Sequence, residues 1–144
     1  MSGITTDPSD PRLGHGIDEK PVQQNEVYIV LSEEERAKGF VRPVRDCYKH
    51  VSCGTTTTMG RALAETYARN PRFYGATYCC ACQMHRPVGE NGEFVWLDGS
   101  KVGTYGETFR RWIMTYFLIG FLAGALVATA GLGYVAYRLG WLKF

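Results

Sequence analysis

The sequence has no cysteine outside residues 47–82, although five cysteines lie within that stretch. An odd number of clustered thiols argues against a secreted disulfide framework, which normally uses an even number. The start of the chain also lacks the basic and then apolar pattern of a secretory signal peptide. These two absences favour reduced thiols on the cytosolic side of a membrane.

Large apolar side chains are scarce in residues 1–25, where Pro8, Pro11 and Pro21 also occur. A segment of this kind cannot offset the entropy cost of its own ordering. We therefore predict that residues 1–25 form a disordered leader.

Charged residues are missing from residues 112–137, a run of 26 residues. As a helix, this run would extend about 39 Å, which exceeds the roughly 30 Å hydrocarbon layer of a bilayer. The sequence predicts a single transmembrane helix and tail anchor within residues 110–140, with the lipid bilayer as partner through residues 112–137. The reduced thiols place the preceding domain in the cytosol, at a bacterial inner membrane.

Small residues recur every four positions within this run, at Gly120, Gly124 and Ala128. Such a stripe lets two helices approach closely and predicts a helix–helix dimer. The alternative is that glycine and alanine are simply common in helices of this type. The missing charges argue against transport or a proton relay.

Between the leader and the apolar run, the pattern predicts a small α+β domain over residues 26–105. A β-branched stretch at residues 27–31 predicts a strand, and Ser32 with Glu35 forms a capping box that begins a short helix. A second helix is expected over residues 59–70, capped by Thr57 or Thr58. The Asn91–Gly92 pair predicts a tight hairpin turn before a strand at residues 93–97.

Four residues in two matching pairs predict a metal site. His50-x-x-Cys53 and Cys79-x-x-Cys82 are separated by 25 residues. Zinc prefers four nitrogen or sulfur ligands in a tetrahedron, and two residues three apart in a tight turn can both reach one ion. The sequence therefore predicts Zn²⁺ bound by these four residues in a zinc-ribbon-like domain of short helices and β-hairpins.

Other residues compete for the ligand positions. Cys47 and His85 each extend a spacing of three and stay open as replacements. Cys80 has the wrong spacing, and we expect it to pack as a small apolar group. Gly54 follows Cys53 and suits a metal-binding turn, whereas Gln83 stands at the equivalent place after Cys82.

A shell of one histidine and three cysteines leaves no open position for water, so the predicted zinc is structural and the protein is not an enzyme. The pair Cys79 and Cys82 also permits a different interpretation, a membrane-bound thiol oxidoreductase. The alternation of strands and helices typical of thioredoxin-like folds is missing from the sequence. A catalytic zinc is disfavoured because Asp46 is the only acidic residue next to a candidate ligand.

Charge is distributed unevenly along the chain. Residues 1–35 carry eight acidic and two basic side chains, whereas residues 36–86 carry nine basic and two acidic ones. This basic block (residues 36–86) can bind nucleic-acid phosphates, with Tyr48, Tyr74 and Tyr78 stacking on bases. The alternatives are anionic lipid head groups, the acidic leader or a solvated surface. The basic block contains Arg36, Lys38, Arg42, Arg45, Lys49, Arg61, Arg69, Arg72 and Arg86.

Several of these stretches resemble small uncharacterised proteins encoded by bacteriophages and prophages. The resemblance covers about residues 31–103. It rests on residues 31–45, 64–67 and 73–76 and on the motifs His50-x-x-Cys53-Gly54, Thr58-Met59-Gly60 and Cys79-x-x-Cys82. It implies no activity, but it supports the pairing of His50 and Cys53 with Cys79 and Cys82.

The sequence as a whole predicts a non-enzymatic, membrane-anchored zinc-binding module of phage type that presents its small domain to a protein or nucleic-acid partner. A small membrane-active lysis accessory is a further alternative, based on the glycine stripe.

Overall fold

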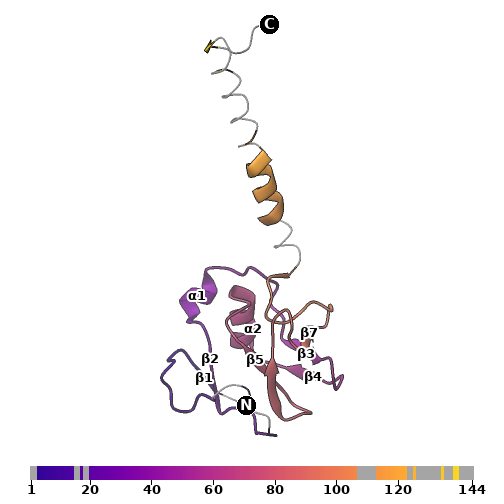
Figure 1. Cartoon of the computed structure of the whole chain (residues 1–144). Coiled ribbons are helices and arrows are strands. Elements are labelled where there is room, and N and C mark those ends of the chain that lie inside the picture. The colour runs from indigo at the N-terminus through magenta and orange to yellow at the C-terminus, as the bar shows by residue number, and fades with distance from the viewer. Residues whose placement is uncertain are drawn as a thin grey trace. The chain divides into compact units, whose positions relative to one another are not determined.

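The computed structural model describes residues 3–14, 17, 20–106, 113–122, 125, 134, 138 and 139. The chain divides into two units, Met1–Gly106 and Glu107–Phe144, and each is described by itself. The first unit is a small α+β fold of short strands and two short helices (Figure 1). Its elements are β1 (Gly3–Thr5), β2 (Val27–Ile29), α1 (Glu33–Ala37), β3 (Cys47–His50), β4 (Thr56–Thr58), α2 (Arg61–Arg69), β5 (Ala76–Cys79), β6 (Met84–Pro87) and β7 (Phe94–Trp96).

The strands form three small sheets. β3 lies in the centre of an antiparallel sheet in the order β4-β3-β7, and β5 pairs with β6 in an antiparallel hairpin. β1 and β2 form a parallel pair. The β3–β4 and β5–β6 hairpins lie close to each other, because the backbone N–H of Cys80 donates to the side-chain oxygen of Thr57 over 3.4 Å.

An aromatic core holds these pieces together. The ring of Tyr48 packs edge-on against Phe94 and Trp96, at centroid distances of 5.4 and 6.4 Å. Tyr67 brings α2 into the same cluster through an edge contact of 5.7 Å with Trp96. Cys79 is fully buried beside them. A residue predicted as a metal ligand is therefore also part of the hydrophobic core.

The two helices follow the sequence patterns to different degrees. In α1 the hydroxyl of Ser32 accepts a hydrogen bond from the Glu35 N–H over 3.3 Å, which is one half of the predicted capping box. The Glu35 carboxylate pairs instead with Lys38. α2 is shorter than predicted and begins after Gly60, with no side-chain cap. The threonines proposed as caps instead form β4, because their β-branched side chains suit a strand paired with β3.

The described part of the leader differs from the predicted disorder. β1 pairs with β2 from Gly3 opposite Val27 to Thr5 opposite Ile29. The N–H of Val22 also donates to the backbone oxygen of Gln83 over 2.7 Å. The leader buries little apolar surface of its own, and its order in the structure comes from backbone hydrogen bonds to other segments.

The strands on either side of the turn predicted at residues 91–92 do not pair with each other. β7 pairs with β3, with Phe94 opposite His50, and β6 pairs with β5. The turn itself is formed, since the Gly92 N–H donates to the Gly89 oxygen over 3.0 Å. A second tight turn occurs one strand later, where Gly99 has a φ of 82° and the Trp96 N–H donates to Ser100 over 2.8 Å. The non-local pairing of β7 with β3 therefore outweighs the local turn signal.

The predicted transmembrane helix and membrane localisation are wrong. Among the helices of those residues, none is long and apolar enough to cross a bilayer. Trp112 and Tyr137, at the ends of the predicted span, lie outside the described residues.

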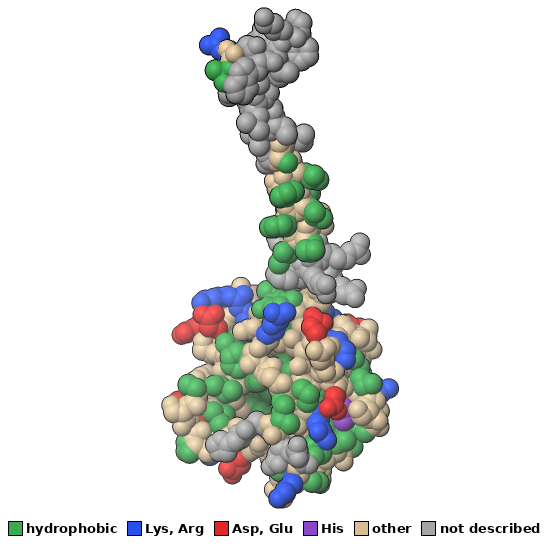
Figure 2. Space-filling model, in the orientation of Figure 1, with side chains coloured by type: hydrophobic (Ala, Val, Ile, Leu, Met, Phe, Trp, Pro, Cys, Tyr) green, Lys and Arg blue, Asp and Glu red, His purple; other side chains and the backbone are tan. Residues whose placement is uncertain are grey.

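Residues 113–122 expose their apolar side chains, which include Phe117 and Phe121 (Figure 2). The predicted dimer stripe is described only at Gly120, where an added Cβ would meet no atom within 4 Å. Gly124 and Ala128 lie outside the described residues, so the helix–helix dimer stays a prediction.

Candidate metal centre

The β3–β4 hairpin carries the first pair of candidate ligands. His50 is the last residue of β3, and Cys53 lies in the turn that follows. The turn is closed by hydrogen bonds from the Gly54 N–H to the His50 oxygen over 2.8 Å and from the His50 N–H to Thr55 over 3.0 Å. Gly54 has a φ of 73°, a left-handed conformation that glycine adopts without a steric penalty.

The β5–β6 hairpin repeats this arrangement. Cys79 is the last residue of β5, and Cys82 lies in the turn before β6. Gln83 takes the place equivalent to Gly54 and has a φ of 51°; among the non-glycine residues that the structure describes, it alone has a positive φ. The second turn therefore has the same backbone form as the first, although its sequence lacks the glycine.

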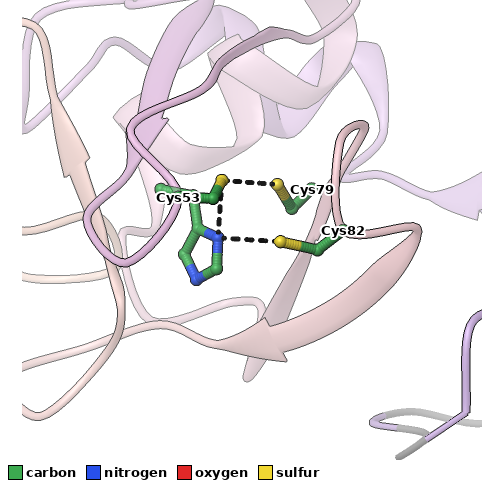
Figure 3. Close-up of side chains that lie close together, drawn as sticks. Cys53, Cys79 and Cys82 are labelled. Atoms are coloured by element: carbon green, nitrogen blue, oxygen red, sulfur yellow. Dashed lines mark hydrogen bonds between the residues drawn. The ribbon is translucent and has the colours of Figure 1, made fainter.

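The four candidate ligands meet at one point (Figure 3). The Sγ of Cys53 lies 3.6 Å from the Sγ of Cys79 and 3.2 Å from the Nδ1 of His50. The Sγ of Cys82 lies 3.4 Å from the same Nδ1, and all four ligand atoms lie within 4.8 Å of one another. In a tetrahedron with Zn–S bonds of about 2.3 Å and Zn–N bonds of about 2.0–2.1 Å, neighbouring ligand atoms lie roughly 3.5–3.8 Å apart. The three shortest separations, 3.2–3.6 Å, are close to these values, so the four side chains could hold a metal ion.

The prediction that these four side chains converge is confirmed, and they can hold a metal ion. Among the described residues, no other group of three or more histidine, cysteine or acidic side chains has this geometry. The competing residues lie elsewhere. Cys47 is at the opposite end of β3 from His50. His85 is buried and packs against Tyr78, at a centroid distance of 5.1 Å.

The expectation for Cys80 is wrong, because its side chain is exposed and not packed in the core. Its Sγ accepts a hydrogen bond from the Thr57 hydroxyl over 3.4 Å. Alternation explains the result: Cys79 points into the core at the end of β5, so the next residue points outwards. Cys79 and Cys80 are thus adjacent in sequence but lie in opposite environments.

The two turn cysteines differ in acidity in the metal-free site. Hydrogen bonds from the side chain and backbone of Thr55 lower the pKa of Cys53 to about 6. Hydrogen bonds with the sulfurs of Cys53 and Cys79 raise the pKa of Cys82 to about 11. The metal-free site at neutral pH therefore holds a thiolate at Cys53 and a thiol at Cys82, and a cation would favour the loss of the second proton.

Two residues that the sequence analysis did not identify support His50. The Nε2 of His50 lies 2.8 Å from an Oε2 oxygen of Glu93. The ring of Phe94 packs on the imidazole at a centroid distance of 4.8 Å and an interplanar angle of 32°. Only the pairing of β7 with β3 brings them there, and no local motif marks that pairing.

The three tyrosines expected to stack on bases make hydrogen bonds within the unit. Tyr48 is 3 % exposed and its hydroxyl donates to the Tyr78 oxygen over 2.6 Å. The hydroxyls of Tyr74 and Tyr78 donate to Ile29 and Val22 over 2.7 and 3.2 Å. All three hydroxyls thus have partners within the unit, and nucleic-acid binding by the basic block stays a prediction.

Several cations of the basic block form ion pairs within the unit. Arg36 and Arg61 both pair with Glu65, Arg45 pairs with Asp98, and Lys38 pairs with Glu35. On the face shown in Figure 2, basic and acidic side chains are interspersed.

Comparisons of the chain with protein-family models, curated proteins and solved structures found no match. The resemblance to phage and prophage proteins therefore stays a prediction.

Proposed function

We propose that the Met1–Gly106 unit is a zinc-ribbon-like interaction module in which one Zn²⁺ ties two hairpins together. The observation that carries this proposal is the convergence of His50, Cys53, Cys79 and Cys82 from two separate turns to within 4.8 Å. These turns are far apart in sequence, and a single ion would link the β4-β3-β7 sheet to the β5–β6 hairpin.

The ligand chemistry favours zinc. One imidazole and three thiolates suit Zn²⁺, whereas Ca²⁺ and Mg²⁺ prefer oxygen ligands. A unit of this size also has a small core, and small domains commonly use a metal to reach a stable fold. In this protein, Cys79 places one ligand inside that core.

A structural role is favoured over a catalytic one. Four protein ligands complete a tetrahedron and leave no position for water or substrate. The alternative of a thiol oxidoreductase at Cys79 and Cys82 needs an accessible thiol of low pKa. Cys79 is fully buried, and the pKa of Cys82 is raised to about 11. Both features oppose the redox alternative.

A protein partner is favoured over a nucleic acid. The tyrosines expected to stack on bases are held in the core by their hydroxyls. Phe40, Val41 and Val44, in contrast, are 47 %, 50 % and 44 % exposed within one loop. Exposed apolar groups close together are typical of surfaces that bind other proteins.

The test is metal analysis of the full-length chain purified without chelator. We expect one zinc per chain, and we expect excess chelator to remove it and to abolish the cooperative thermal transition. A metal-free chain that neither binds added Zn²⁺ nor changes its melting temperature with it would overturn the proposal. Titration with a single-stranded oligonucleotide tests the choice of partner, since tight and salt-dependent binding would favour nucleic acid.

A further inference from the structure

The two ring nitrogens of His50 face different partners. Nδ1 lies 3.2 and 3.4 Å from the sulfurs of Cys53 and Cys82, and so points to the place where a metal would sit. Nε2 lies 2.8 Å from the Oε2 of Glu93. A neutral imidazole has one N–H and one free lone pair, and an ionised carboxylate can only accept. The proton therefore belongs on Nε2, and the lone pair of Nδ1 faces the three sulfurs.

Glu93 is fixed in this position by the backbone on both of its sides. The N–H of Val51 donates to the Glu93 oxygen over 2.9 Å, and the N–H of Glu93 donates to the Pro87 oxygen over 3.0 Å. The first bond continues the pairing of β7 with β3, and the second reaches the end of β6. Glu93 is thereby tied to both hairpins that supply the ligands.

Phe94, which follows Glu93 and is the first residue of β7, contacts the ring of His50 from a second direction. Phe94 is fully buried and lies against the imidazole face, while Glu93 meets the imidazole edge. His50 is itself only 3 % exposed. The face contact limits ring rotation, and the edge contact selects the tautomer.

We propose that Glu93 is a positioning residue of the metal site, which holds His50 as an Nδ1 ligand through a carboxylate–histidine–metal relay. The inference rests on the proposed function, since it assumes that the four ligands bind zinc. A carboxylate that accepts from a ligand histidine fixes its orientation and makes it a stronger donor. Glu93 would then increase zinc affinity without contacting the ion.

The test compares zinc affinity across variants of the full chain, measured by competition with a chromophoric chelator. Glu93→Ala should weaken binding about 10- to 100-fold, the usual effect of losing such a partner. Glu93→Asp keeps the charge but is one methylene too short, and should lose as much as alanine. Glu93→Gln keeps an acceptor at the same reach and should retain most of the affinity. Glu90→Gln removes an exposed charge from the same connection and is the matched control.

A second measurement separates positioning from a general effect on folding. Nitrogen NMR of the zinc-bound chain should show a protonated Nε2 and a metal-bound Nδ1 at His50. All variants should show the same strand content by circular dichroism at saturating zinc.

Two results would overturn the inference while leaving the proposed function intact. One is an affinity for Glu93→Ala equal to that of Glu90→Gln, and the other is metal bound through Nε2. A wild-type chain that binds no zinc would contradict both the proposed function and the inference.

Discussion

The two ligand-bearing hairpins share one backbone design and differ in the residue that completes it. Each ends its first strand on a ligand, places a cysteine three residues later, and follows it with a residue of positive φ. That residue is Gly54 in the β3–β4 hairpin and Gln83 in the β5–β6 hairpin, with φ values of 73° and 51°. The turn is therefore defined by its backbone conformation, and glycine adopts that conformation with less strain than glutamine.

The surroundings of the two hairpins differ more than their backbones. His50 depends for its orientation on Glu93 and on Phe94, the first residue of β7. Cys79 is fully buried in the aromatic core and is held by packing. One hairpin thus offers a ligand positioned by a polar partner, and the other a ligand anchored in the core.

The largest expected effect comes from removing the core-anchored ligand. Cys79→Ser should abolish tight zinc binding and lower the free energy of unfolding by more than about 4 kcal/mol, as losses of a structural metal do. Cys80→Ser changes the same side chain one residue away at an exposed position, and should stay within about 0.5 kcal/mol of the wild type. Zinc content and chemical denaturation measure both. Equal stabilities for the two variants would show that the hairpins do not need the metal.

An intermediate loss of stability is expected from removing a hydrogen bond between β3 and β5. The Tyr48 hydroxyl of β3 donates to the Tyr78 oxygen of β5 over 2.6 Å. Tyr48→Phe should lower the free energy of unfolding by about 1–2 kcal/mol. Tyr134→Phe, at an exposed ring, is the control and should have no effect.

The same tyrosine gives the fold an alkaline limit. Burial raises the pKa of Tyr48 to about 12, whereas an unfolded tyrosine titrates near about 10. Its contribution is complete below about pH 10 and is lost as the pH rises through the folded pKa, because the unfolded chain releases the proton first. Denaturation at several alkaline pH values should show a smaller decline in Tyr48→Phe than in the wild type. An identical decline in both proteins would contradict this assignment.

The smallest effects are expected from substitutions of the two turn residues of positive φ, Gly54 and Gln83. Gly54→Ala should destabilise by about 0.5–1 kcal/mol, because the left-handed conformation costs more than the entropy that alanine saves. The only atom near an added Cβ is the Lys49 Cε at 4.0 Å, so the cost is one of backbone strain. Gln83→Gly should stabilise by a similar amount, and Gln83→Ala, which keeps a Cβ, should not. Melting curves with saturating zinc measure all three, and a loss of stability in Gln83→Gly would contradict the shared turn geometry.

The local patterns of the sequence predicted much of the site. The repeated spacing of His50 with Cys53 and of Cys79 with Cys82 was sufficient to select the four side chains that converge. The predicted helix start was also correct, because the Ser32 hydroxyl accepts from the Glu35 N–H at the beginning of α1. In each case, the information lies within a few residues of one turn.

Several features could not be predicted because they depend on pairing between segments that are distant in sequence. Glu93 could not be identified because its role follows from the pairing of β7 with β3. The predicted hairpin at residues 91–92 failed for the same reason, and the helix caps proposed at Thr57 and Thr58 failed because those residues join β4. The transmembrane prediction is wrong, because no helix of the described residues is long and apolar enough to span a bilayer.

The central claim is that one zinc ion is held by a nitrogen and three sulfurs drawn from two turns. X-ray absorption spectroscopy of the purified full-length chain tests it most directly. The account predicts a first shell of three sulfurs at about 2.3 Å and one nitrogen at about 2.0–2.1 Å. A chain without zinc, or a zinc shell made mainly of oxygen and nitrogen, would contradict it.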